Sequence, residues 1–246
     1  MTAPIFLLRP LPDAEHLTLD GEEGRHAATV RRLRVGERVD VTDGEGRVAW
    51  CVVTGAARDR LELQVERRTE EPEPQPRIVV VQALVKGDRS ELAVELLTEL
   101  GVDEIVPWEA QRCVATWMPE RSPRRWEGAA AAASKQSRRA RWPVVASLAD
   151  TAAVQNRLAA ASNGFVLHEE AAEPLVRALP VPVDGIVPRG EIVIVVGPEG
   201  GLTDNELAGF ASAGAKAVRL GPSVLRASTA GCAAAAVVLA GCGRWG

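Results

Sequence analysis

Two stretches near the end of the chain combine glycine and proline with a few charged side chains. They read "GPEGGLTDNE" at residues 197–206 and "LGPSVLRASTAG" at residues 220–231, where Arg226 stands among small residues. Glycine lets main-chain N–H and C=O groups approach a ligand closely, and proline fixes its own φ, so such loops are shaped before a ligand arrives. A plain strand-to-helix turn would explain either stretch alone. Two of them together favour a pocket whose ligand is bound largely by main-chain atoms.

The elements around these stretches alternate between strands and helices. The continuous apolar run at residues 77–86 is typical of a parallel strand buried on both faces. A helix is expected next, over residues 88–101, with Asp88 and Glu91 at capping-box spacing and Gly101 at its end. Thr203 and Glu206 have the same spacing after "GPEGG", where a later helix is expected to begin. This alternation predicts an α/β domain with a parallel sheet covered by helices on both faces. Its further strands are expected at residues 103–108, 143–148, 164–169, 191–197 and 216–221, and its further helices at 123–140, 149–161, 203–214 and 225–240.

The loops that follow three of these strands carry the unusual residues. They are "LHEE" at residues 167–170, "GPEGG" at 197–201 and "LGPSVLR" at 220–226. In open α/β sheets the ligand lies outside the carboxyl ends of the strands, so the three loops are expected to line one site. No G-x-G-x-x-G follows a strand and no G-x-x-x-x-G-K-[ST] occurs, which disfavours dinucleotides and nucleoside triphosphates. An adenosine-type or other small-molecule pocket remains.

The first part of the chain has a different pattern. Short segments with period-two alternation, separated by Asp-Gly and Gly-Glu-Gly turns, predict a small antiparallel barrel with one helix over residues 24–36. "TEEPEPQPR" at residues 69–77 then forms a stiff spacer of acids and prolines. We therefore predict two domains, residues 1–72 and residues 73–246.

Composition narrows the class of protein. The 246 residues are 46% hydrophobic and 25% charged, as in globular proteins, and no apolar run is long enough to cross a bilayer. The N-terminus shows neither a basic leader nor a cleavage pattern, which predicts a cytoplasmic protein. The four cysteines and three histidines are scattered, so neither a disulfide framework nor a metal site is expected.

Arginines gather in two windows although the formal net charge is -4. One window contains Arg25, Arg31, Arg32, Arg34 and Arg38, and the other runs from Arg121 to Arg141. A charge run is most often a solvated face. Such clusters also bind nucleic-acid phosphates, with an affinity that weakens as salt rises.

The paired motifs "VIVVGPEGGLTDNE" and "AVRLGPSVLRASTA" closely resemble the signature of SPOUT-superfamily methyltransferases, specifically the RsmE-type family. That family methylates the N3 atom of a uridine in small-subunit (16S) ribosomal RNA. "QALVKGDRSELAVELLTELGVDEIVP", "KQSRRARWP" and "HAATVRRLRVGERVDVTDGEG" are similar to its other blocks, so the resemblance covers nearly the whole chain. It implies a PUA-like RNA-binding barrel before a SPOUT domain with a C-terminal trefoil knot.

The resemblance also implies a cofactor, partners and site residues. S-adenosylmethionine would bind in the knotted loops, two subunits would pair through the C-terminal domain, and ribosomal RNA or the small subunit would be the substrate. The residues that the resemblance assigns to the cofactor are Leu167, His168, Glu169, Gly197, Pro198, Glu199, Gly200, Gly201, Leu220, Gly221, Val224, Leu225, Arg226 and Thr229. Those expected at the RNA are Arg9, Arg25, His26, Arg31, Arg32, Arg34, Arg138 and Arg139.

The chain departs from the family at two places. Many relatives have an acidic residue after the arginine motif where this chain has Ser228, and Arg9 stands in for an arginine of their N-terminal arm. In the implied reaction a cation stabilises the negative charge that develops on the uracil imide, and Arg226 is the candidate. The alternative is a structural arginine that binds the carboxyl ends of loops or the other subunit. Two roles are open for Glu199, accepting the N3 proton or binding a loop amide, and the second is preferred.

Two other functions stay open from the residues alone. One is a non-catalytic dimeric RNA-binding protein, which would not bind S-adenosylmethionine. The other is an enzyme acting on a small molecule, whose turnover would not depend on the arginines of the first domain. The target nucleotide, the proton acceptor and the choice between naked RNA and an assembled subunit are not encoded in any motif.

Overall fold

The computed structural model describes residues 3–180, 182 and 186–245. The chain divides into two compact units, one made of Met1–Glu73 with Ser134–Trp142 and the other of Pro74–Ala133 with Pro143–Gly246. The proposed boundary between residues 72 and 73 remains a prediction. Sequence reasoning did not anticipate that residues 134–142 group with the first unit.

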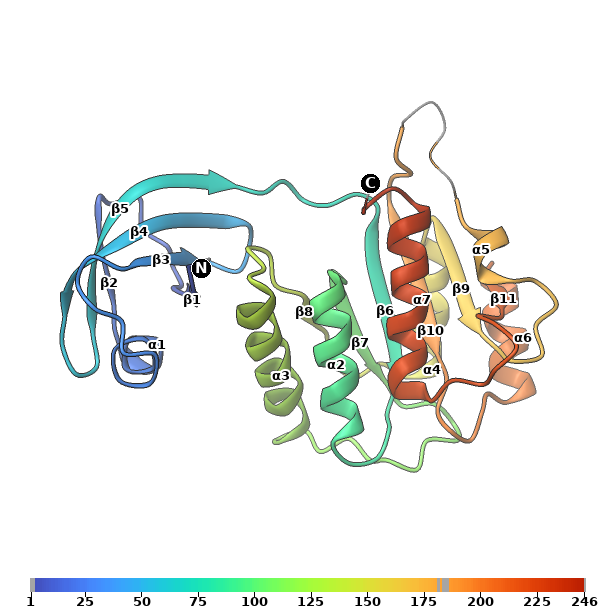
Figure 1. Ribbon diagram of the computed structural model, residues 1–246. Coiled ribbons are helices and arrows are strands. Elements are labelled where there is room, and N and C mark those ends of the chain that lie inside the picture. The colour runs from blue at the N-terminus through green and yellow to red at the C-terminus, as the bar shows by residue number, and fades with distance from the viewer. Residues whose placement is uncertain (1–2, 181, 183–185, 246) are drawn as a thin grey trace. The chain divides into compact units, whose positions relative to one another are not determined.

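The first unit is built on a curled five-stranded sheet (Figure 1). The four strands expected from the sequence pair antiparallel, and a fifth that was not expected, the edge strand β1, runs parallel to β3. Inward side chains such as Phe6, Leu19 and Leu61 form its core. The helical segment starts earlier than predicted and ends in a π-helical turn. The elements are β1 (Ile5–Leu7), β2 (His16–Leu19), α1 (Gly21–Arg25), η1 (His26–Val30), β3 (Arg38–Thr42), β4 (Arg47–Ala56) and β5 (Leu61–Glu70).

Residues 134–142 bind the first unit by direct hydrogen bonds. The Thr42 hydroxyl donates to the Ala140 carbonyl over 2.8 Å, and the Trp142 amide donates to the Gly44 carbonyl over 2.9 Å. Arg141 donates to the Glu71 carbonyl over 2.8 Å, and Lys135 pairs with Glu23. These bonds join residues that lie 70 to 112 positions apart, so no local sequence pattern reveals them.

The second unit contains the predicted parallel sheet. Its six strands lie in the order β11-β9-β10-β6-β7-β8, and every neighbouring pair is parallel. Their carboxyl ends therefore share one edge. The strands are β6 (Arg77–Ala83), β7 (Glu104–Trp108), β8 (Val144–Val145), β9 (Asn163–Leu167), β10 (Glu191–Val196) and β11 (Lys216–Val218).

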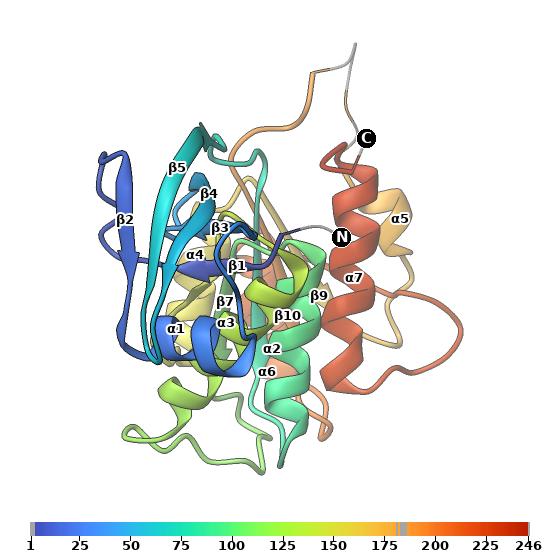
Figure 2. The same ribbon diagram turned by 60° about the vertical axis from the view of Figure 1, so that its left-hand side comes forward.

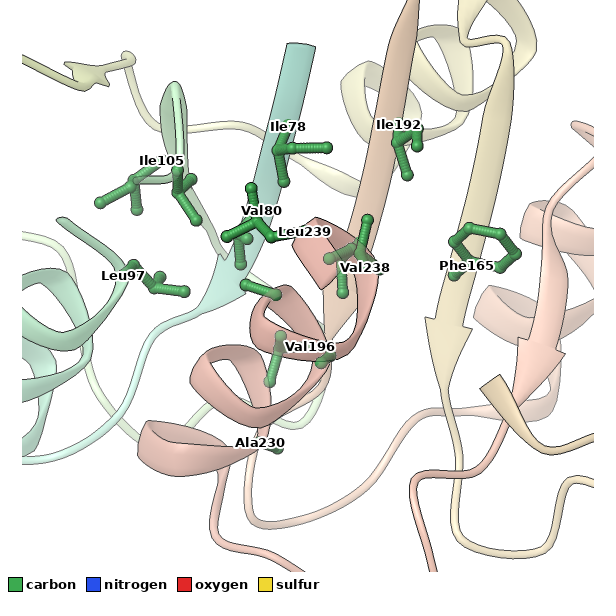
Figure 3. Close-up of a cluster of buried hydrophobic side chains, with 14 of the residues drawn as sticks. Ile78, Val80, Leu97, Ile105, Phe165, Ile192, Val196, Ala230, Val238 and Leu239 are labelled. Carbon is green, nitrogen blue, oxygen red and sulfur yellow. The ribbon is translucent and has the colours of Figure 1, made fainter. Parts of the chain in front are cut away.

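Helices cover both faces of this sheet. Alternate strand residues such as Ile78 and Val80 meet Leu97 and Val238 on one face (Figure 3). Their neighbours, Val79 among them, form a second cluster on the other face. The helices on the first face are α2 (Arg89–Leu100), α3 (Ser122–Ser137), α5 (Leu175–Ala178) and α7 (Ala227–Gly241), and those on the second are α4 (Thr151–Ala160) and α6 (Asp204–Ser212).

The last helix returns across the sheet. From the edge strand β11 the chain runs back to the middle of the sheet. There α7 packs on β6 and β10 and lies beside α2 (Figures 1 and 2). Near its end, Leu179 from the β9–β10 connection packs so closely on Gly241 that a Cβ there would lie 2.5 Å from the Leu179 side chain. The parallel sheet with helices on both faces is as predicted.

Two helices were expected to begin with a capping box, and only one of the two does. At α6, Thr203 and Glu206 form the predicted capping box. At α2 the prediction was wrong, because Asp88 makes no side-chain cap and Glu91 instead accepts a hydrogen bond from Arg125 over 2.5 Å. Gly101 does end α2 with the expected left-handed backbone, at φ 102°.

An ionic cluster joins the amino ends of three strands, at the opposite edge from the three loops. Arg157 of α4 contacts Glu104 over 2.5 Å and Glu191 over 2.8 Å, and Arg77 contacts Glu104 over 2.7 Å. Burial raises the pKa of Glu104, but hydrogen bonds and charge from Arg157, with Arg77, outweigh it and hold that pKa below its ordinary 4.5. The cluster therefore stabilises the fold only while Glu104 is ionised.

We expect Arg157→Ala to lower the free energy of unfolding by about 3 kcal/mol at pH 7, because it leaves the buried Glu104 carboxylate short of a partner. Since the folded pKa of Glu104 is depressed, this contribution is present above its unfolded pKa and is lost as pH falls through the folded pKa. Urea unfolding at pH 7 and at several pH values below 4.5 measures this. The difference in free energy of unfolding between the wild type and Arg157→Ala should shrink as the solution becomes more acidic. Arg60→Ala, which breaks the exposed pair with Glu62, should cost under about 1 kcal/mol. An equal loss in both variants would contradict the assignment.

Candidate functional site

A cavity of about 360 Å³ opens where β9, β10 and β11 end. These three strands are neighbours and parallel, so the loops that follow them meet at one place. Twelve of the fourteen residues assigned to the cofactor line this cavity. They are Leu167, His168, Glu169, Gly197, Pro198, Glu199, Gly201, Leu220, Gly221, Val224, Leu225 and Arg226.

The other two assigned residues do not line the cavity. A Cβ at Gly200 would lie 3.1 Å from the Arg112 carbonyl oxygen, so this glycine allows a close approach between two loops. The Thr229 hydroxyl donates to the Arg226 carbonyl over 3.2 Å within the first turn of α7. A cofactor role for any of the fourteen remains a prediction.

Several lining residues were missed from the sequence. They lie inside the two quoted motifs, as the last residues of strands, further residues of the loops or one face of the first turn of α7. Their position beside the assigned residues is the signal that could have found them. They are Val196, Leu202, Val218, Arg219, Pro222, Ser223, Ala227 and Ala230.

The "GPEGG" loop is braced by the segment after β7. Arg112 donates to the carbonyl oxygens of Gly200 and Leu202 over 3.2 and 3.1 Å. The Gln111 amide donates to the buried Glu206 carboxylate over 2.8 Å, so the capping residue of α6 also holds this segment. Gly201 has φ +73°, which a side chain rarely adopts. No motif around Arg112 announces this positioning role.

The first and third loops are tied to each other. The His168 amide donates to the Val218 carbonyl over 3.0 Å, and the His168 Nδ1 accepts from the Glu170 amide over 3.3 Å, which orients the imidazole. Arg219 donates to the Ala171 carbonyl over 3.2 Å. The cavity walls are therefore fixed by bonds inside the second unit.

Arg226 is the cation at the cavity whose side chain stays available. It precedes α7 with extended backbone, and its carbonyl accepts from the amides of Thr229 and Ala230. Within the described part of the chain its guanidinium makes no hydrogen bond or ion pair, in contrast to Arg219, and it is exposed. Glu199, on the facing loop, is exposed as well. The pair offers a cation and an anion to a ligand.

The cavity suits a nucleoside that bears a positive charge. Its volume lies in the usual range of about 300–1,000 Å³ for small-molecule pockets. Apolar walls from Val196, Leu202 and Val218 fit a planar base, while the carboxylates of Glu169 and Glu199 fit hydroxyls or a cation. These are the chemical features of S-adenosylmethionine.

The residues predicted to meet RNA lie in the first unit. Arg25, Arg31, Arg32, Arg34 and Arg138 are exposed, and Arg32 and Arg138 have left-handed backbone with φ 56° and 59°. His26 packs edge-on against Phe6, and Arg139 is half-buried. Arg9 donates to the Asp43 carbonyl and lies 5.9 Å from the centre of the Trp142 ring.

Two kinds of feature are absent from the described residues. They contain no group of three or more His, Cys, Asp or Glu side chains placed to hold a metal ion. No helix among them has the length and apolar character needed to cross a membrane.

Known proteins share this sequence and fold. Residues 71–239 match the RNA methyltransferase domain family, and residues 19–66 match the RNA methyltransferase PUA domain family. The ribosomal RNA small subunit methyltransferase E of Mycobacterium tuberculosis is 45% identical, with 100% of this chain and 94% of that protein covered. The Bacillus subtilis protein of that name is 27% identical, with 89% of this chain and 88% of its own covered.

A solved structure gives the same result. The ribosomal RNA small subunit methyltransferase E of Neisseria gonorrhoeae, bound to S-adenosyl methionine, has a TM-score of 0.81 and 28% identity, covering 97% of this chain and 98% of its own. The match spans both units, and the resemblance first visible in the two glycine-rich motifs holds over the whole chain. The chain belongs to the ribosomal RNA small subunit methyltransferase E family.

Proposed function

We propose that this protein transfers a methyl group from S-adenosylmethionine to the N3 atom of a specific uridine in small-subunit (16S) ribosomal RNA. The observation that carries the proposal is the single cavity where β9, β10 and β11 end, walled by both glycine-rich motifs. Family membership supports the reaction class, and the Neisseria gonorrhoeae relative binds S-adenosyl methionine in its solved structure.

The cofactor would lie against the three loops. Val196, Leu202 and Val218 would contact its base, main-chain groups of residues 197–201 and 220–222 its polar edges, and Glu169 or Glu199 its hydroxyls or charge. When bound, it supplies an electrophilic methyl group on sulfur. The braces from Arg112 and Glu206 keep the second loop in place for this contact.

The proposed role of Arg226 is to make uracil N3 a better nucleophile. Uracil N3 carries a proton at neutral pH and becomes nucleophilic only as that proton leaves to the solvent and negative charge spreads onto the flanking carbonyl oxygens. A guanidinium beside one of these oxygens stabilises that charge as it forms. The Arg226 side chain lines the cavity, is exposed and has no ion-pair partner among the residues that the structure describes, as this role requires. Holding N3 in line with the methyl group supplies a further part of the acceleration.

The RNA must present an unpaired base. N3 lies on the Watson–Crick edge, so the target uridine is unstacked or single-stranded when it reacts. The exposed arginines of the first unit would hold phosphates and make affinity fall with salt. A ribosomal RNA substrate also argues for a cytoplasmic enzyme.

The test mixes the purified protein, labelled S-adenosylmethionine and small ribosomal subunits that lack the modification. Label should appear in a single uridine, identified as the N3-methyl nucleoside by digestion and mass spectrometry. Because N3-methylation blocks base pairing, reverse transcription should also stop at that nucleotide. Label on a carbon, on a ribose or on another base would refute the N3 assignment, and absence of cofactor binding would favour a non-catalytic RNA-binding protein.

We also propose a homodimer through the C-terminal domain. α7 has no charged residue, and several of its small apolar residues stay partly open to solvent: Cys232, Ala233, Ala236, Val237 and Ala240. Ala236→Glu should therefore convert a dimer to a monomer in light scattering, because a carboxylate cannot be buried there without a partner. Ala208→Glu, on the exposed side of α6, should leave the mass unchanged. A wild-type monomer would contradict the proposal.

A further inference from the structure

A groove on the first unit combines an aromatic ring with charges of both signs. None of its lining residues lines the cofactor cavity, and its volume is about 800 Å³. Of the residues predicted to meet RNA, only Arg31 lines it. Its charged and aromatic lining residues are Arg31, Glu37, Arg38, Asp40, Trp50, Glu66 and Arg67.

Trp50 is held in one orientation while part of it stays open. Its indole Nε1 donates to the Thr69 hydroxyl over 3.1 Å, and the Arg67 guanidinium carbon lies 4.4 Å from the ring centre. The residue nevertheless remains 39% exposed. An aromatic ring that is both fixed and open to solvent offers a stacking surface at little cost in conformational entropy.

Strand pairing aligns Trp50 with an acid and a cation. Asp40 of β3 is opposite Trp50 of β4, and Trp50 is opposite Arg67 of β5. The Asp40 carboxyl is half-buried, and burial raises its pKa although Arg138 and Arg67 oppose the shift. A carboxylate partly stripped of water gains from N–H donors on a ligand.

This set of groups selects one kind of ligand. A planar base stacks on an indole and guanidinium, and the flanking Arg31 and Arg38 suit a phosphate. A carboxylate accepts hydrogen bonds only, so it prefers a base edge with two adjacent N–H donors. Guanine has such an edge, at N1–H and the 2-amino group. Adenine and cytosine offer a single amino group there, and the N3–H of uracil lies between two repelling carbonyl oxygens.

We propose that this groove binds one unpaired guanosine of the RNA, stacked on the Trp50–Arg67 pair and read by Asp40. The inference rests on the proposed function only for the identity of the RNA. The first unit would then take part in substrate selection, because it would contact a base as well as phosphates. Phosphate contacts alone would give affinity without sequence preference.

The test compares Trp50→Ala and Asp40→Asn with the wild type. Stacking on a protein aromatic contributes about 1–3 kcal/mol, so Trp50→Ala should raise KM for unmodified subunits about 10- to 100-fold with kcat within twofold. Binding of a fluorescent single-stranded oligoribonucleotide containing one guanosine should weaken to a similar degree. Asp40→Asn should reduce the preference for that oligonucleotide over one with adenosine in the same place.

Matched variants separate this site from general effects. Trp245→Ala removes an exposed indole of the second unit, 52% exposed, and Arg60→Ala removes a cation of the first unit outside the groove. Both should leave KM and oligonucleotide affinity unchanged. Circular dichroism and S-adenosylmethionine affinity should match the wild type in all four variants.

The outcomes distinguish the two proposals. If the wild type methylates subunits but Trp50→Ala and Asp40→Asn change neither KM nor oligonucleotide affinity, the groove proposal is overturned and the function stands. If the wild type transfers no methyl group, yet guanosine preference depends on Asp40 and Trp50, the groove stands and the function fails.

Discussion

Arg226→Ala should lower kcat about 100- to 1,000-fold while S-adenosylmethionine affinity changes little. The reason is that Arg226 acts on charge that exists only as N3 loses its proton, and removal of one such donor typically costs that factor. The side chain is exposed and makes no hydrogen bond or ion pair with a described residue, so the substitution removes no such bond from the fold. Single-turnover methylation of unmodified subunits, with calorimetric cofactor titration alongside, measures both quantities.

Two further variants sharpen this result. Arg226→Lys should recover part of the rate, because a lysine keeps the charge but not the planar fork. Arg177→Ala, on the exposed side of α5, should react like the wild type. A loss of cofactor affinity equal to the loss of rate would show that Arg226 holds the cofactor instead of stabilising the imide.

Gly221→Val should weaken S-adenosylmethionine binding about 10- to 100-fold without lowering the melting temperature. Gly221 lines the cavity, and a Cβ built there meets no protein atom within 4 Å. Added methyl groups therefore fit the empty protein but occupy space at the cavity wall, and overpacking costs about 1–3 kcal/mol. Calorimetric titration gives the affinity, and the affinity of Gly221→Ala should lie between those of the wild type and Gly221→Val.

Gly128→Ala is the matched control for this experiment. A Cβ at Gly128 also meets nothing within 4 Å, but this residue lies on α3, outside the cavity. It should stabilise the helix by up to about 1 kcal/mol and leave cofactor affinity unchanged. Normal affinity in Gly221→Val would mean that the cofactor does not occupy this wall.

Much of the second unit was predictable because most of its strands and helices have a residue pattern that is recognisable within the element itself. Buried runs such as residues 191–197, and the Thr203–Glu206 cap, depend on neighbours along the chain, so β10 and α6 are where the pattern places them. The failed cap at Asp88 marks the limit of this reasoning, since Glu91 bonds a residue 34 positions away. The reaction class was predicted from the resemblance of the two glycine-rich motifs to a known family, and the hydrophobic periodicity gave no information about it.

By itself the sequence determined the element types, the two glycine-rich loops and the presence of Arg226, because these follow from local propensity and residue identity. Only the tertiary structure decided that β9 lies between β10 and β11, and this brings the three loops into one cavity. It likewise placed Arg112 behind the "GPEGG" loop and aligned Asp40, Trp50 and Arg67 across three strands. Such contacts depend on pairing between distant segments, which follows from the packing of the whole chain and leaves no trace in local spacing.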